Sequence, residues 1–177
     1  DTKVGLYLFN CNEYLTSQFA TMKVMGVPIN VNYRYQSDEL VYLFDNSDSE
    51  VVFFHESYLD QVKQVHKKLP NVKTWIQIGG VKDPEIDGCF SYEEIISSND
   101  PMKRIVRDED NIYMIYTGGT TGMPKGVMYN HGEFSVAMYG GLKSQGYEVP
   151  DMRFRENIKD LKEIIMNKSK SNNLTRC

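Results

Sequence analysis

Short apolar runs of strand-like composition alternate with segments of helical periodicity along the first 80 residues. The strand-like runs are residues 4–9, 27–31, 51–54 and 72–78. Between them, apolar residues share helical faces in three groups: Leu15, Phe19 and Met22; Leu40, Leu43 and Phe44; and Leu59, Val62, Val65 and Leu69. This β-α-β-α-β-α-β order predicts an α/β fold with a mostly parallel sheet and helices on its faces. Continuous apolar strands favour the parallel arrangement, since such strands are covered on both sides.

Local signals place the ends of these elements. Asn10 and Glu13 have the spacing of a capping box, as do Ser91 and Glu94. Residues 26–28 and Pro70 are expected to end the first and third helices. Residues 80–88 and 97–110 are interpreted as surface connections because they are polar and contain proline.

The second half adds a strand at residues 112–116 and another at 127–129 that leaves a glycine-rich loop. Residues 132–143 are predicted to be helical, with Phe134, Ala137 and Met138 on one face. Ile158, Leu161 and Ile165 predict a last amphipathic helix.

Composition excludes several classes of protein. The 177 residues are 41% hydrophobic, enough for one domain or for part of a larger one. A net charge of −4 disfavours a nucleic-acid-binding protein. Cys11, Cys89 and Cys177 form no pair motif, which favours a reducing compartment, and we expect a cytoplasmic protein. No signal peptide and no membrane-spanning run is evident. The apolar start after Asp1 and the end at Cys177 indicate a fragment.

The loop between the last two strands is the one segment whose composition indicates chemistry. It reads Thr117, Gly118, Gly119, Thr120, Thr121, Gly122, Met123, Pro124, Lys125 and Gly126. The glycines leave backbone N–H groups open to an anion. The threonines add hydroxyl donors, Lys125 adds a positive charge, and Pro124 restricts the backbone before it. Together these groups predict a cradle for a polyphosphate.

The alternatives to a polyphosphate cradle are a simple hairpin connection, a P-loop and a dinucleotide-binding loop. A glycine- and threonine-rich turn can be only a hairpin connection. A P-loop needs Gly-Lys-Ser/Thr opening a helix, and here Lys125 follows proline and precedes a strand-like run. The dinucleotide fingerprint fails because Gly118 and Gly119 are adjacent. Cys11, Cys89 and the helix-starting His131 are expected to be structural rather than nucleophilic, and the scattered histidines predict no metal site.

Residues 115–129, IYTGGTTGMPKGVMY, closely resemble the phosphate-binding signature of the adenylate-forming superfamily of acyl-CoA synthetases, luciferases and peptide adenylation domains. Gly118 stands where that signature usually has serine, which affects one phosphate contact. The form here is most similar to the fatty acyl-CoA synthetases. The resemblance covers residues 4–140 and is weak beyond them. It implies that residues 1–177 are part of the large N-terminal AMP-binding domain, without the C-terminal domain.

The resemblance also implies an activity. Family members use ATP and Mg²⁺ to join a carboxylic acid to AMP, and coenzyme A then displaces AMP. Thr117, Gly118, Gly119, Thr120, Thr121, Gly122 and Lys125 are expected to hold the β- and γ-phosphates, with Lys125 in a catalytic role through its charge. The partners are thus small molecules. Later family motifs for adenine, ribose and Mg²⁺ are not found in this sequence, so we expect no turnover by this chain alone. An adenylation domain for another acceptor and a non-catalytic remnant remain alternatives, and the acyl chain length is open.

Overall fold

The computed structural model describes residues 1–103, 105, 110–117 and 123–146. The chain divides into two compact units, Asp1–Gly132 and Glu133–Cys177. Within the described part, the elements follow in this order: β1 (Lys3–Tyr7), α1 (Asn12–Lys23), β2 (Val27–Asn30), α2 (Ser37–Asn46), β3 (Ser49–His55), α3 (Leu59–Val65), β4 (Thr74–Ile78), β5 (Cys89–Ser91), α4 (Tyr92–Ser98), β6 (Ile112–Thr117), β7 (Lys125–Asn130) and α5 (His131–Ser144). Short 3-10 turns, Glu56–Tyr58 and His66–Lys68, flank α3.

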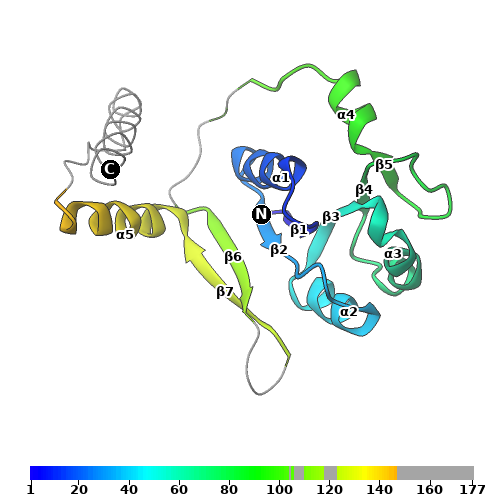
Figure 1. The fold of residues 1–177 in the computed structure, drawn as a ribbon, viewed down its shortest axis with the longest axis horizontal. Helices are drawn as coiled ribbons and strands as arrows, with labels where there is room; N and C mark the ends of the chain where they lie inside the picture. Colours follow the sequence, from blue (N-terminus) through cyan, green and yellow to red (C-terminus); the bar gives the residue numbers. More distant parts are fainter. Residues whose placement is uncertain (104, 106–109, 118–122, 147–177) are drawn as a thin grey trace, which may run out of the picture. The chain divides into compact units, whose positions relative to one another are not determined.

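The strands of the first unit form one seven-stranded sheet with the order β5-β4-β3-β1-β2-β6-β7. Every neighbouring pair is parallel except β6 and β7, which form an antiparallel hairpin. From β1 the chain moves to β2 on one side and then to β3 on the other. Right-handed crossovers therefore put α1 on one face and α2 on the opposite face. Figure 1 shows α1 and α4 on one side of the strands and α2 and α3 on the other. The prediction of a mostly parallel α/β sheet with flanking helices is confirmed.

The hydrophobic core lies between the sheet and the α2–α3 layer. Trp75 of β4 is buried at its centre, with Phe44 of α2 and Phe54 of β3 packed edge-on at ring-centroid distances of 6.2 and 6.3 Å. Leu40 and Leu43 of α2 are also fully buried, so the predicted apolar face of this helix is the one that packs on the sheet. Aromatic pairs in this geometry contribute beyond the area that they bury.

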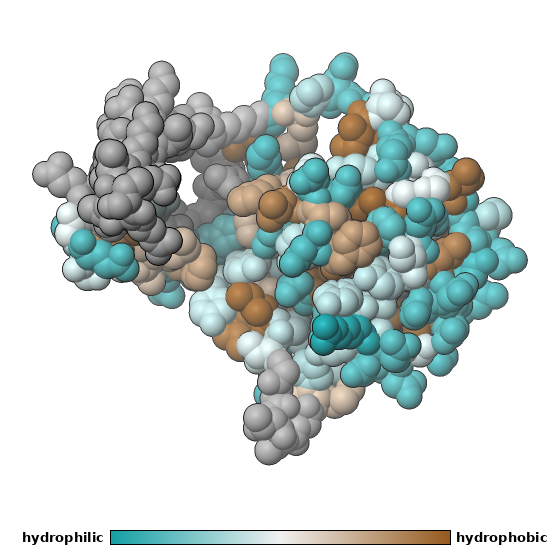
Figure 2. Space-filling model, viewed as in Figure 1, coloured by the Kyte–Doolittle hydropathy of each residue, from teal (hydrophilic) through white to brown (hydrophobic). Residues whose placement is uncertain are grey.

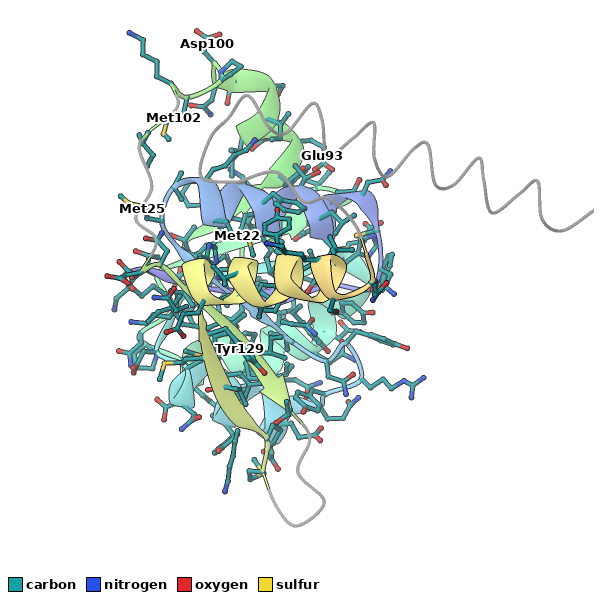
Figure 3. All side chains as sticks on the ribbon, turned by 90° about the vertical axis from the view of Figure 1, so that its left-hand side faces the viewer. Met22, Met25, Glu93, Asp100, Met102 and Tyr129 are labelled. Carbon is teal, nitrogen blue, oxygen red and sulfur yellow. The ribbon has the colours of Figure 1, made fainter. Side chains whose placement is uncertain are left out.

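The opposite layer differs from the usual pattern of a surface helix. Leu15 and Phe19 do share one face of α1, but they are 54% and 58% exposed. The face on the sheet carries Ser17 and Thr21, which are 1% and 5% exposed. Small side chains let the helix lie close to β1 and β2. Burial of Thr21 costs little because its hydroxyl donates to the carbonyl oxygen of Ser17 at 2.8 Å. In Figure 3, Met22 of α1 and Glu93 of α4 lie on this same side of the sheet.

Several predicted boundaries need correction. The N-cap of α1 is Cys11 and its side chain makes no capping bond, so the capping box at Asn10 was wrong. The cap at Ser91 is confirmed, because its hydroxyl accepts a hydrogen bond from the N–H of Glu94 at 3.3 Å. Strand β5 was not expected, since three residues beside a loop carry no periodic signal. The predicted helix at residues 158–165 lies outside the described part of the chain.

Surface hydrophobic residues are dispersed on the face drawn in Figure 2, where brown side chains occur singly or in small groups among teal ones. No helix in the described part of the chain has the length and apolar character needed to cross a bilayer.

Candidate functional site

The hairpin of β6 and β7 brings the two ends of the predicted phosphate loop together. Thr117, the last residue of β6, pairs directly with Lys125, the first residue of β7. Residues that face each other across an antiparallel pair project to the same side of the sheet, with Cβ atoms roughly 5 Å apart. A hydroxyl donor and an ammonium group therefore lie side by side at the root of the loop. The other predicted site residues are Gly118, Gly119, Thr120, Thr121 and Gly122, which lie outside the described residues.

The loop begins at the carboxyl edge of the parallel sheet. Strand β6 is parallel to β2, with Asn30 at the end of β2 paired to Ile115, two residues before Thr117. The first loop residue therefore follows the point where the neighbouring strands also end. In open α/β sheets, ligands bind outside this edge. The loop is thus at the part of the fold that is best suited to a ligand.

A strand, not a helix, follows the loop, as the sequence predicted. This geometry differs from a P-loop, whose lysine lies at the start of a helix and whose phosphate is held by that helix N-terminus. The donors of this loop must come from its own backbone, its hydroxyls and Lys125. No carboxylate among the described residues pairs with Lys125, and the residue is exposed. Its positive charge is therefore available to an anionic ligand.

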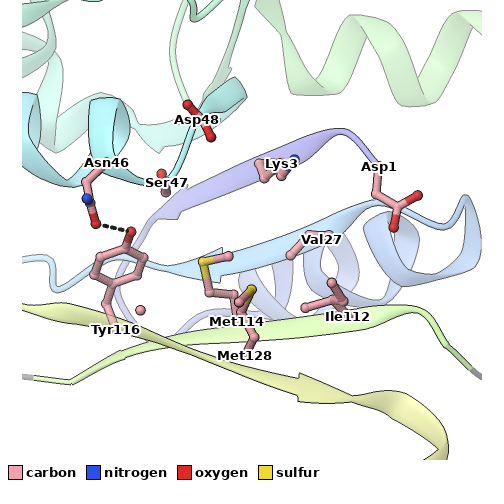
Figure 4. A pocket seen from close by; sticks show the side chains of 11 residues that line it. Asp1, Lys3, Val27, Asn46, Ser47, Asp48, Ile112, Met114, Tyr116 and Met128 are labelled. Atoms are coloured by element: carbon pink, nitrogen blue, oxygen red, sulfur yellow. Dashed lines mark hydrogen bonds between the residues drawn. The ribbon is translucent and has the colours of Figure 1, made fainter.

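Successive side chains along the hairpin point to opposite faces of the sheet. Thr117 and Lys125 are on the α1 side, together with Tyr113, whose hydroxyl accepts a hydrogen bond from Gln18 of α1 at 3.1 Å. On the α2 side, a hollow of about 410 Å³ adjoins the hairpin. Figure 4 shows the side chains that line it, among them Val27, Asn46, Ile112, Met114, Tyr116 and Met128. The hollow is therefore on the face opposite to the Thr117–Lys125 pair.

Two residues of α2, which the sequence did not single out, contact the hairpin at the root of the loop. The hydroxyl of Tyr116 donates to Oδ1 of Asn46 at 2.8 Å, the bond dashed in Figure 4. The hydroxyl of Tyr42 donates to the carbonyl oxygen of Pro124 at 3.2 Å. Burial raises the pKa of Tyr116, and the nearby Tyr42 adds to this effect. Polar residues four apart are common on helices, so spacing alone could not have identified this pair.

The remaining candidates lie elsewhere and have structural settings. Cys11 and Cys89 are free thiols, and burial raises the pKa of each above its ordinary value, which disfavours the nucleophilic thiolate. His131 begins α5, and its backbone N–H donates to the carbonyl oxygen of Asn111 at 2.8 Å. It lies six positions beyond Lys125 along an extended strand, roughly 20 Å away. Over the described ranges, no cluster of three or more His, Cys, Asp or Glu side chains could hold a metal ion.

Comparisons with known proteins agree with this geometry. The family model described as AMP-binding enzyme matches residues 1–156. A medium/long-chain-fatty-acid–CoA/3-oxocholest-4-en-26-oate–CoA ligase of Mycobacterium marinum is 40% identical over 146 residues, 78% of this chain and 26% of the relative. A 3-oxocholest-4-en-26-oate–CoA ligase of Rhodococcus rhodochrous is 38% identical over 143 residues, with 79% and 26% covered. The chain thus spans about a quarter of the length of these curated relatives.

Solved structures show the same fold. A long-chain-fatty-acid-CoA ligase of Archaeoglobus fulgidus superposes with a TM-score of 0.69 at 26% identity, over 85% of this chain and 29% of that one. An anthranilate CoA ligase in complex with anthranoyl-AMP gives a TM-score of 0.70 at 23% identity, over 77% and 26% of the two chains. The sheet and its flanking helices therefore have the arrangement found in CoA ligases.

Proposed function

Because this chain belongs to the AMP-binding enzyme family, we propose that the whole protein is an AMP-forming carboxylic acid–CoA ligase. In its first step the carboxylate oxygen attacks the α-phosphorus of ATP, and pyrophosphate leaves with the electron pair of the broken P–O bond. In the second step the thiol sulfur of coenzyme A attacks the acyl carbon. AMP then leaves as the thioester forms, and the thiol proton goes to solvent or a base. Residues 1–177 would be part of the N-terminal AMP-binding domain.

The pairing of Thr117 with Lys125 at the carboxyl edge of the sheet carries this proposal. Both groups suit the departing pyrophosphate, since one donates a hydrogen bond and the other neutralises negative charge. Preorganised donors and cations of this kind stabilise the charge that develops during phosphoryl-group chemistry. We assign the same duty to Gly118, Gly119, Thr120, Thr121 and Gly122. In this proposal the loop residues bind and stabilise the phosphates, and we assign proton transfer to none of them.

We assign no described residue to the metal or to the acid. Mg²⁺, which would neutralise phosphate charge, has no cluster of ligands among the described residues, so we assign it no residue and no step. We propose a medium- or long-chain fatty acid, or another hydrophobic acid, because the ligases named above act on acids of that type. We also propose a cytoplasmic location, which the free thiols of Cys11 and Cys89 support.

Pyrophosphate exchange by the full-length protein tests this function. We expect ATP–pyrophosphate exchange that depends on a medium- or long-chain fatty acid, and a thioester product on addition of coenzyme A. Lys125→Ala should lower kcat/KM for ATP about tenfold or more, because a charge-assisted contact to phosphate is lost. Lys125→Arg should retain part of the activity, and Lys67→Ala, an exposed lysine of a 3-10 turn, is the matched control.

Three results of this assay would each refute a different part of the proposal. Absence of exchange by the wild-type protein with every fatty acid tested would refute the ligase assignment. Exchange without a coenzyme A thioester would refute coenzyme A as the acceptor and support an adenylating enzyme for another acceptor. Equal activity of Lys125→Ala and Lys67→Ala would refute the use of the Lys125 charge.

A further inference from the structure

The two arms of the phosphate-loop hairpin are each tied to α2 by one side-chain hydrogen bond. Tyr42 donates to the carbonyl oxygen of Pro124 at 3.2 Å, and Asn46 accepts from the hydroxyl of Tyr116 at 2.8 Å. Tyr42 and Asn46 are four residues apart and so lie one turn apart on the same face of the helix. Their partners directly precede Lys125 and Thr117. Both ties therefore act on the residues adjoining the Thr117–Lys125 pair.

The helix that holds these ties is itself fixed to the core. Leu40, Leu43 and Phe44 of α2 are 1% exposed or less. Phe44 packs edge-on against the buried Trp75. A helix anchored along this face shifts only by disturbing the packing of the core. Tyr42 and Asn46 thus extend from a rigid element toward a hairpin that stands at the end of the sheet.

Within the described structure, the hairpin is held to the rest of the sheet through one strand. In the described structure, β7 pairs only with β6, and β6 pairs with β2 through a short register at Ile29 and Asn30. A terminal two-stranded ribbon twists more freely than a central strand. Twisting of the ribbon would change the direction in which the Thr117 and Lys125 side chains project. Small misplacements of binding groups are costly to catalysis.

Gly126 makes the tie through Tyr116 possible. It pairs with Tyr116 across the hairpin, and a Cβ at this position would lie 3.0 Å from Cε2 and 3.1 Å from Cζ of the Tyr116 ring. The absence of a side chain at Gly126 leaves room for the Tyr116 ring beside β7. In this position the Tyr116 hydroxyl reaches Asn46. A side chain at position 126 would displace the ring and lengthen the hydrogen bond.

We propose that Tyr42 and Asn46 are positioning residues that fix the direction of the Thr117 and Lys125 side chains through Tyr116 and Pro124. This inference rests on the proposed function, because it assigns these residues to the affinity for ATP. It also predicts an asymmetry between the substrates. Loss of either tie should weaken the use of ATP and leave the use of the fatty acid unchanged, since both ties end beside the phosphate pair.

Steady-state kinetics of the full-length enzyme test the asymmetry. Tyr42→Phe and Asn46→Ala should each lower kcat/KM for ATP about three- to tenfold, the effect of one lost hydrogen bond, with KM for the fatty acid unchanged. Tyr33→Phe and Asn71→Ala are the matched controls, because both residues are exposed and neither hydrogen-bonds to the hairpin within the described structure. In a double-mutant cycle, Asn46→Ala should add little to Tyr116→Phe, because both remove the same bond.

Equal losses for ATP and the fatty acid, or losses no larger than in the controls, would overturn the proposal. So would additive effects of Asn46→Ala and Tyr116→Phe. A second measurement separates this result from the proposed function. Hydrogen exchange should be faster at the amides of Thr117 and Lys125 in Tyr42→Phe than in Tyr33→Phe. If the wild-type protein catalyses no ATP–pyrophosphate exchange, the ligase assignment fails. The hydrogen-exchange comparison still decides whether α2 supports the hairpin. Equal amide hydrogen exchange in the two variants would reject that support.

Discussion

Gly5→Ala tests the packing of the core between β1 and α2. A Cβ on Gly5 would lie 2.6 Å from Cε1 and 3.2 Å from Cδ1 of Phe44, and 3.4 Å from Cγ2 of Val52. Carbon atoms in contact are ordinarily about 3.5–4.0 Å apart, so the Phe44 ring must move by roughly 1 Å. It cannot do so freely because it is buried and packed on Trp75. Overpacking of this kind costs about 1–3 kcal/mol, the loss of unfolding free energy that we expect.

Urea unfolding followed by the fluorescence of Trp75, the one tryptophan of the chain, measures this loss. The reporter adjoins the ring that must move. Gly140→Ala is the control, because a Cβ at Gly140 meets nothing within 4 Å. In a Phe44→Leu background, Gly5→Ala should cost less than in the wild type, since the obstructing ring is gone. A cost below about 0.5 kcal/mol, or the same cost in both backgrounds, would refute this reasoning.

Three further predictions concern buried polar groups. Ser17→Ala should stabilise the chain by about 1 kcal/mol in urea unfolding, because the buried Ser17 hydroxyl has no hydrogen-bond partner among the described residues and alanine favours the helix. A loss of stability would contradict this. Gln77 is 2% exposed, and its side-chain amide donates to the carbonyl oxygens of Gly79 and Val81 and accepts from the N–H of Asp83. Gln77→Ala should therefore lower the free energy of unfolding by about 2–4 kcal/mol and speed hydrogen exchange in residues 79–83. Unchanged hydrogen exchange would show that Gln77 does not hold this loop. Burial raises the pKa of Tyr7 from 10.0 to about 12. The stability that comes from this pKa shift is complete below pH 10 and is lost as the pH rises to about 12. Tyr7→Phe should therefore flatten the alkaline loss of stability, and parallel pH profiles of the two proteins would contradict this prediction.

The part of the fold predicted from sequence is the part that repeats a strong local pattern. Residues 51–54 lie in β3, and residues 112–116 lie in β6, because short apolar runs between polar segments favour buried strands. The strand after the glycine-rich loop was predicted at residues 127–129, and the structure has it at Lys125–Asn130. Since only seven residues separate Thr117 from Lys125, the short separation in sequence favours their pairing. The family resemblance could therefore be found from one short segment of the sequence.

Features that depend on distant contacts could not be predicted. Leu15 and Phe19 mark an apolar face of α1, yet the sheet takes the face of Ser17 and Thr21. Periodicity defines such a face but does not identify the surface that meets it. The ties from α2 to the hairpin join residues 70 and 82 positions apart. No sequence signal links them, because each bond depends on the strand order that puts β6 beside β2.

That strand order has a consequence for folding during synthesis. In a chain made from its N-terminus, β1 to β5 and α2 are complete before β6. The edge of β2 that later pairs with β6 stays open while roughly 80 more residues are added. This takes about 4–16 s at ordinary translation rates. The pairing of β2 with β6 is thus a late step that closes a long stretch of chain, whereas β6 and β7 can join locally within microseconds. The β6–β7 hairpin is therefore added to a support that already exists. Agents that bind an open strand edge have their opportunity in this interval.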